Sequence, residues 1–113
     1  MPADRSETIE IRYVSAVTVA DILAPFDFID YLETDLQSAE VAVLPPVTGY
    51  LKRKVRRIHV GTHSREGHRR LHQAFAADGW TTIFDYEPYA TYETPLGTFS
   101  TDDGLLTFRN PLL

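Results

Sequence analysis

The sequence contains no cysteine, and this absence excludes several kinds of chemistry. There is no disulfide framework, no thiolate metal site and no cysteine nucleophile. The sequence also lacks any apolar run near the roughly 20 residues that a membrane-spanning helix needs. Its opening residues, MPADRSETIE, are too polar for a signal peptide. We therefore expect a cytoplasmic protein without a membrane partner.

The chain also lacks an excess of positive charge. Its net charge of −5 argues against a nucleic-acid partner, because phosphate contacts need a basic footprint. The local exception is the basic run at 52–57, KRKVRR. This run is typical of a solvated helix end followed by a strand, although an anionic ligand or a protein contact also remains open.

Clustered glycine is missing too. The six glycines are scattered singly along the chain, and none forms a G-x-G-x-x-G pattern after a strand. Without such a pattern, the chain cannot build the tight loop that brings backbone amides up to a nucleotide cofactor. We therefore assign no cofactor-binding residues.

The remaining composition is that of a folded globular protein. Hydrophobic residues make up 43% and charged residues 24% of the chain, which excludes a disordered polypeptide of low hydrophobicity. A length of 113 residues fits one small domain covering 1–113.

Periodicity predicts strands that alternate with helices. Strands are expected near 8–13, 28–34, 56–61, 80–86 and 105–108, and helices from a capping box at Thr18, over 38–44, and from an N-cap at Ser64 to a C-terminal glycine at Gly79. Residues 47–54 fit either a loop or a further helical turn. The alternation predicts an α/β fold with flanking helices and a mostly parallel sheet of about five strands. A long loop that contains Pro88, Pro95 and Gly97 is expected between the last two strands. No helical pattern lies between these strands, so we expect them to form an antiparallel hairpin.

Polar side chains follow two neighbouring predicted strands. Asp35 comes after one strand and His63 after the next, and ligands bind at the carboxyl ends of strands in open α/β sheets. A carboxylate that orients an imidazole suits general-base catalysis. Glu40, five residues after Asp35, can point to the same rim. The plainer interpretations are a helix cap for Asp35, a loop hydrogen bond for His63 and a helix-dipole position for Glu40.

The four histidines occur in two pairs at a spacing of four residues, His59 with His63 and His68 with His72. Two histidines one helical turn apart can share a metal ion. A small metal-dependent enzyme using Asp35, Glu40 and His63 or His68 is therefore an alternative. The H-E-x-x-H pattern is absent, and we assign no metal ligands.

Two stretches carry a resemblance to a known family. Residues 29–40, IDYLETDLQSAE, are similar to the pattern of an apolar strand followed by Asp, an apolar residue, Gln or Glu, Gly, Ala and Glu. The second stretch comprises VRRIHVGTH at 55–63, then His68, Leu71, Phe75, Gly79 and Trp80, FDY at 84–86, DGLLT at 103–107 and Asn110-Pro111. Together they resemble the C-terminal half of FkbM-type S-adenosylmethionine-dependent methyltransferases from about Thr8 onward.

This resemblance implies the later strands of the Rossmann-like class I methyltransferase sheet, in which the final hairpin inserts one antiparallel strand. It also implies S-adenosylmethionine as cofactor and O-methyl transfer to a hydroxyl group of a sugar or natural product. The first two strands of that fold, which carry the donor loop, have no counterpart here. The chain alone is therefore expected to be inactive, and to form a homo-oligomer or to join a missing N-terminal half.

The chain departs from the family pattern at two positions beside the expected substrate face. Ser38 stands where the family has Gly, and Thr34 stands where Lys or Met is common. A glycine at position 38 would permit a positive φ, whereas serine can serve as a helix N-cap. These departures leave a second interpretation open, a non-catalytic protein-interaction module derived from a methyltransferase.

Overall fold

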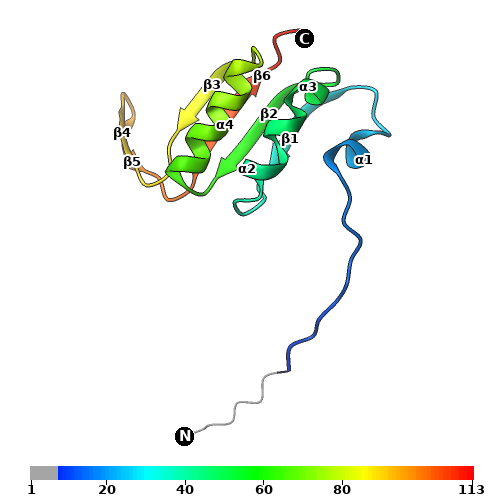
Figure 1. The fold of residues 1–113 in the computed structure, drawn as a ribbon. Coiled ribbons are helices and arrows are strands. Elements are labelled where there is room, and N and C mark those ends of the chain that lie inside the picture. Colours follow the sequence, from blue (N-terminus) through cyan, green and yellow to red (C-terminus); the bar gives the residue numbers. More distant parts are fainter. Residues whose placement is uncertain (1–7) are drawn as a thin grey trace, which may run out of the picture.

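The computed structural model describes residues 8–113 as an α/β fold (Figure 1). Four strands form the main sheet: β1 (Ile29–Thr34), β2 (Val55–Thr62), β3 (Thr81–Tyr86) and β6 (Gly104–Arg109). Two further strands, β4 (Thr91–Thr94) and β5 (Gly97–Ser100), form a separate antiparallel hairpin.

The main sheet is mixed, with the strand order β1-β2-β6-β3. β1 and β2 are parallel, and β6 lies between β2 and β3, antiparallel to both. The predicted antiparallel pairing of the last two strands of this sheet is thus confirmed. The sheet is therefore not the mostly parallel one of about five strands that the sequence predicts. Four of the expected strands are present, β1 and β2 are its parallel neighbours, and β1 is an edge strand.

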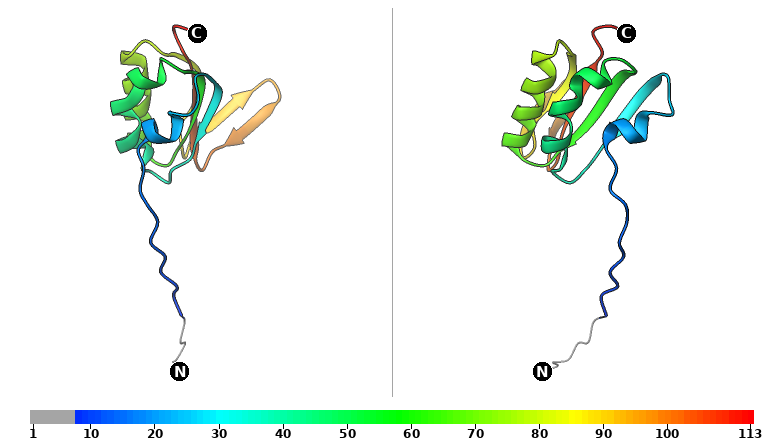
Figure 2. Two further views of the ribbon diagram at one scale, coloured as in Figure 1. Left: turned by 90° about the vertical axis from the view of Figure 1, so that its right-hand side faces the viewer. Right: turned by 45° about the vertical axis from the view of Figure 1, so that its right-hand side comes forward.

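Short helices connect the strands: α1 (Val19–Leu23), α2 (Glu40–Val43), the 3-10 helix η1 (Pro45–Val47), α3 (Thr48–Leu51) and the longer α4 (Arg65–Ala77). α2, α3 and α4 cover one face of the main sheet (Figure 2). Within residues 8–113 no helix is long and apolar enough to cross a membrane.

Helix α4 forms where the sequence predicts it. The Ser64 side chain accepts a hydrogen bond from the backbone N–H of Gly67, and Gly79 follows the helix with φ of +87°. Glycine adopts this left-handed conformation without the steric cost that a Cβ brings. At the other end of the chain, Thr18 and Asp21 form the predicted capping box of α1.

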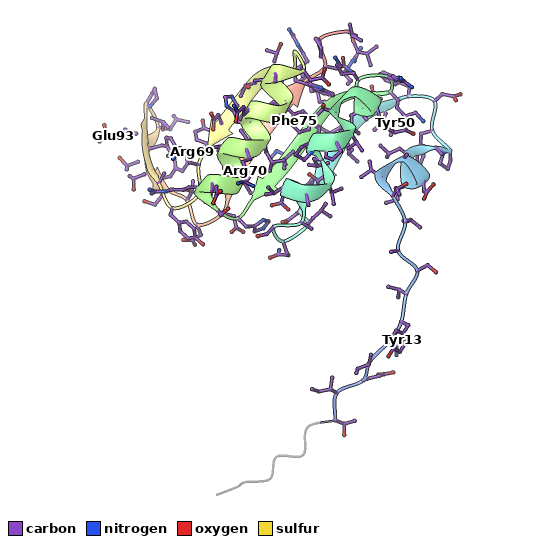
Figure 3. The ribbon with its side chains drawn as sticks, in the orientation of Figure 1. Tyr13, Tyr50, Arg69, Arg70, Phe75 and Glu93 are labelled. Atoms are coloured by element: carbon purple, nitrogen blue, oxygen red, sulfur yellow. The ribbon has the colours of Figure 1, made fainter. Side chains whose placement is uncertain are left out.

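The core lies between the sheet and α4. Phe75, labelled in Figure 3, stacks on Phe108 with ring centroids 4.4 Å apart and meets Trp80 edge to face at 5.4 Å. All three side chains are buried, as is Leu71 one turn earlier. The predicted apolar stripe of α4 is thus the surface that packs against the sheet.

The opposite face of the sheet carries no helix among the described residues. Tyr31, His59, Phe84 and Tyr86 line a hollow of about 440 Å³ on it. The β4–β5 hairpin projects on this side (Figure 2).

Three local predictions are wrong. Residues 8–13 form no strand, although they alternate as a strand does. Ser38 caps no helix: it has a φ of +80°, and α2 begins two residues later, after the N-cap residue Ala39. The stretch predicted as one long loop after β3 contains the β4–β5 hairpin. Residues 47–54, left open by the sequence, include the single helical turn of α3.

Candidate functional site

The three candidate residues lie together at the carboxyl ends of β1 and β2. Asp35 follows β1 directly and His63 follows β2 directly, and the two strands are parallel and in register. Glu40 is the first residue of α2. His63 Nε2 lies 3.0 Å from Asp35 Oδ1, and its Nδ1 lies 2.9 Å from Glu40 Oε1. The imidazole therefore sits between two carboxylates.

The turn between β1 and α2 places Glu40 over His63. Gln37 and Ser38 have φ values of +52° and +80°, so two consecutive residues adopt left-handed conformations and reverse the chain. Gly61 of β2 leaves room for the Asp35 side chain. A Cβ at position 61 would lie 3.3 Å from Asp35 Oδ1.

Glu40 is fully buried, which is unusual for a carboxylate. Its Oε1 accepts a hydrogen bond from His63 Nδ1, while Oε2 is buried with no hydrogen-bond partner among the described residues. Burial of a charge is costly unless a partner compensates it. His63 is that partner.

Two groups contact Nδ1 of His63. The backbone N–H of Ser38 donates a hydrogen bond to Nδ1 at 3.3 Å, and Glu40 Oε1 lies closer, at 2.9 Å. The contact with an ionised Glu40 requires a proton on Nδ1, whereas the contact with Ser38 requires a lone pair there. The contact of Nε2 with Asp35 is an ion pair without hydrogen-bond alignment.

Asp103 adds a third carboxylate that sequence reasoning missed. Its Oδ2 lies 4.0 Å from His63 Nε2. The motif Asp102-Asp103-Gly104 reads as a turn, which explains why its side chains were not considered. Its position depends on the pairing of β6 with β2, in which Gly104 lies opposite Thr62 at the end of β2.

The carboxylates raise the pKa of His63 above its ordinary value. The hydrogen bond to Glu40 contributes most, burial of the ring opposes it, and the charges of Glu40, Asp103 and Asp35 add to the increase. Each carboxylate favours the imidazolium, so the ring is protonated to a higher pH than a free histidine.

An apolar hollow of about 380 Å³ adjoins this site. Asp35 lies on its wall, together with Val19, Ile22, Leu23, Leu32, Glu33, Thr34, Leu36 and Leu44. The side chain of Asp35 is 60% exposed, whereas that of His63 is 12% exposed. Asp35 is thus the residue that the hollow shares with the site, and neither His63 nor Glu40 lines it.

The arrangement is that of a carboxylate–imidazole pair. Glu40 contacts the ring at Nδ1, and the buried Nε2 lies against Asp35 on the other side of the ring. We name Glu40, His63 and Asp35 the rim triad. Asp103 lies at its edge.

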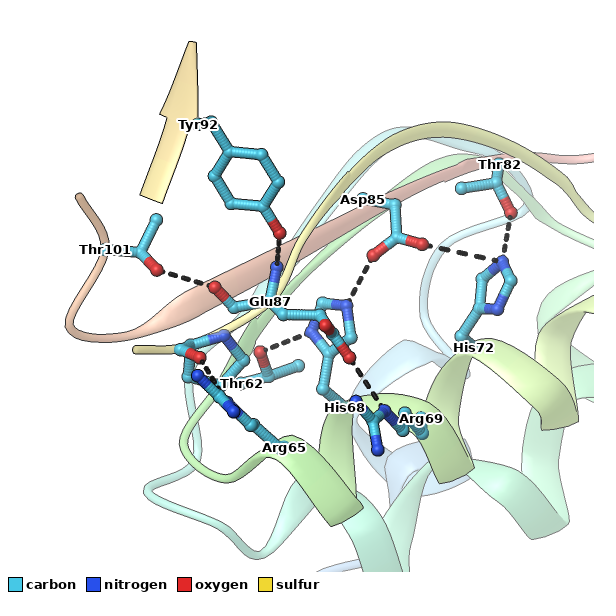
Figure 4. Close-up of polar contacts among 11 residues, drawn as sticks. Thr62, Arg65, His68, Arg69, His72, Thr82, Asp85, Glu87, Tyr92 and Thr101 are labelled. Atoms are coloured by element: carbon cyan, nitrogen blue, oxygen red, sulfur yellow. Dashed lines mark hydrogen bonds and ion pairs between the residues drawn. The ribbon is translucent and has the colours of Figure 1, made fainter. Parts of the chain in front are cut away.

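The other histidines serve elsewhere. The buried His68 bridges Thr62 Oγ1, 2.8 Å from its Nδ1, and Asp85 Oδ1, 2.5 Å from its Nε2 (Figure 4). His72 contacts Thr82 Oγ1 at 3.1 Å. These contacts tie α4 to β2 and β3, so His68 is a structural side chain apart from the rim triad.

His59 is separated from His63, its predicted partner. Its Nδ1 lies 3.0 Å from Thr107 Oγ1, and its ring stacks with Tyr31 on the open face of the sheet. Within residues 8–113 no group of three or more His, Cys, Asp or Glu side chains is arranged to hold a metal ion.

Comparisons with protein-family models, with curated proteins and with solved structures find no match to this chain.

Proposed function

We propose that this chain forms the acceptor side of an FkbM-type S-adenosylmethionine-dependent O-methyltransferase, and that the rim triad handles the proton of the acceptor hydroxyl. One observation carries the proposal: the buried Glu40 orients His63 at the carboxyl ends of the parallel strands β1 and β2. Ligands of open α/β sheets bind at this end.

The order of the strands supports the same family. The resemblance implies a final hairpin that inserts one antiparallel strand into a parallel sheet, and β6 lies antiparallel between β2 and β3. The resemblance implies about five strands, the third to the seventh of a seven-stranded sheet, and four strands are found in the order β1-β2-β6-β3. This agreement concerns topology and by itself carries no activity.

The residues of this chain do not fit the methyl donor. None of the glycines forms a nucleotide-binding loop after a strand, and both β1 and β2 are followed by polar side chains of the rim triad. We therefore assign no step through S-adenosylmethionine to this chain. The donor site would have to come from another segment or another chain.

The contribution of the chain's own residues is proton acceptance. Nδ1 is occupied by its contacts with Glu40 and the backbone of Ser38, so Nε2 is the nitrogen that accepts the proton of a bound hydroxyl once Asp35 moves aside. The hydroxyl loses its proton to Nε2, and the imidazolium that forms is stabilised by Glu40. Because the pKa of His63 is raised, this step needs a pH at which the ring has lost its resting proton.

A non-catalytic interaction module is the second candidate. The observation that favours it is the apolar surface around α1, where Ile22, Phe26 and Leu36 are exposed. An exposed apolar patch of this kind often marks a protein contact. In this alternative the rim triad stabilises the turn before α2 and has no substrate.

Nuclear magnetic resonance can separate these candidates. The ¹⁵N-labelled chain is titrated with a set of hydroxylated sugars and phenols, and amide shifts are followed at Asp35, Leu36 and His63. The acceptor-side proposal predicts saturable shifts that are confined to this region and lost in His63→Ala. The matched control His59→Ala changes a histidine on the open face and should retain them. If every compound leaves these amides unmoved, the acceptor site is refuted.

A further inference from the structure

Residues 8–14, which we call the N-terminal segment, expose an apolar face. Ile9, Ile11 and Tyr13 alternate along it and are 79%, 72% and 95% exposed. The segment leads away from the sheet, and Tyr13 is labelled on it in Figure 3. Alternating apolar residues are typical of a strand that buries one face, so this segment has the pattern of a strand without a partner.

The free edge of β1 lies at the end of the sheet nearest to α1. Among residues 8–113, β1 pairs with β2 on one side only, and the strand contains no proline or bulge. The opposite edge of the sheet is less regular, because β3 carries a register shift between Thr82 and Phe84. A regular free edge offers unpaired N–H and C=O groups to another strand.

Apolar surface continues from this edge. A hollow of about 500 Å³ lies beside α1 and α2, with Val17, Ile22, Leu36 and Val43 among its lining residues. The hollow of about 380 Å³ beside Asp35 adjoins it, since Val19, Ile22 and Leu36 line both hollows. A strand added to β1 would therefore have an apolar surface for its buried side chains.

We infer that the N-terminal segment of one copy of this chain pairs with the free edge of β1 in a second copy, and that the exchange is reciprocal. The segment has seven residues and β1 has six, so the lengths match. Burial of Ile9, Ile11 and Tyr13 against a receiving surface of similar size, in both directions, covers on the order of 2,000 Å². A specific homodimer needs an interface of about this size.

The inference is independent of the proposed function, because it uses no residue in a catalytic role. It concerns the edge of β1, whereas the rim triad lies beyond the carboxyl end of that strand. The receiving surface shares Val19, Ile22 and Leu36 with the hollow beside the rim triad, so the acceptor titration is carried out on the monomeric Ile9→Asp and Ile11→Asp variant as well.

Sedimentation velocity of the full chain over a wide concentration range tests the dimer. We expect a species of twice the 12.8 kDa chain mass. The double substitution Ile9→Asp and Ile11→Asp should convert it to a monomer with unchanged circular dichroism, because both side chains are exposed in the single chain. Leu96→Asp is the matched control, since Leu96 is fully exposed at the hairpin tip, and it should leave the dimer intact.

Cross-linking separates exchange between copies from pairing within one chain. The chain lacks cysteine, so Arg12→Cys and Glu33→Cys each introduce a single thiol on an exposed residue. Mixing the two variants with a short bis-maleimide should yield a covalent heterodimer. A monomeric chain at all concentrations, a dimer that survives the double aspartate variant, or a cross-link found only within a doubly substituted chain would each overturn the inference.

Discussion

Ser38 holds a backbone conformation that glycine adopts at lower cost. Its φ is +80°, in the left-handed region, and no hydrogen bond of its side chain is seen among the described residues. An L-residue in this region costs about 1–2 kcal/mol through contact of its Cβ with the backbone. Replacing Ser38 with glycine removes that cost and retains the turn that carries Glu40 to His63.

The gain is partly offset in the unfolded chain. Glycine loses about 0.5–1 kcal/mol more conformational entropy on folding than alanine. We therefore expect Ser38→Gly to raise the free energy of unfolding by about 0.5–1 kcal/mol. For a domain of this size the melting temperature then rises by about 3–6 °C.

Urea unfolding followed by circular dichroism measures the difference. Ser38→Ala is the matched control, because it removes the hydroxyl but keeps Cβ, and it should bring no gain. Ser64→Gly tests the opposite case, since Ser64 has a φ of −147° and caps α4, so glycine there should destabilise the chain slightly. If Ser38→Gly is neutral or destabilising, or if Ser38→Ala stabilises equally, the explanation by backbone strain is refuted.

Three further predictions concern the Glu40–His63 pair and the close packing around Gly104. Glu40→Gln should lower the pKa of His63 toward its ordinary value, because the hydrogen bond to the Glu40 carboxylate is the largest cause of the raised pKa. NMR titration of the imidazole measures this, and an unchanged pKa would contradict the Glu40–His63 ion pair. Since the folded-state pKa of His63 is raised, its stabilising contribution is full below the ordinary value of about 6.5 and is lost as the pH rises through the raised value. Urea unfolding as a function of pH should show this loss, and Glu40→Gln should reduce it. Gly104→Ala should destabilise by more than about 2 kcal/mol, because its Cβ would meet Thr62 Oγ1 and the carbonyl of Tyr86; a melting temperature equal to the wild type would contradict this.

Short sequence patterns predicted those elements that have clear capping residues and a periodic apolar face. α4 has a cap at Ser64, a stop at Gly79 and a stripe that includes Leu71 and Phe75, so propensity and packing agree. The segment 8–13 has an equally clear alternation and forms no strand. Alternation reports a face that can be buried, but a strand also needs a neighbour to pair with. The sequence pattern alone does not supply that neighbour.

The β4–β5 hairpin was hidden for a different reason. The stretch that contains Pro95, Leu96 and Gly97 is predicted as part of a long loop. In the structure it is the turn of a hairpin, where Gly97 takes a φ of +131°. Most side chains of the two strands are exposed, so they lack the apolar pattern that marks a strand. Tyr92 and Phe99 nevertheless pack edge to face against Tyr86.

Much of the candidate site could be placed from the sequence. The convergence of Asp35 with His63 follows from two parallel strands that end at the same edge. The burial of Glu40 could not be predicted, because it depends on the left-handed turn at Gln37 and Ser38. Asp103 was missed because its position depends on the insertion of β6 beside β2. Short-range patterns do not report such tertiary placement.

Calorimetric titration of the purified chain with S-adenosylhomocysteine tests most directly the claim that this chain holds the acceptor side without the donor site. The account predicts no saturable heat up to about millimolar ligand, because no glycine-rich loop follows a strand. Saturable binding in the micromolar range would contradict it, and would show that the chain or its assembly builds a donor site from residues other than those of such a loop.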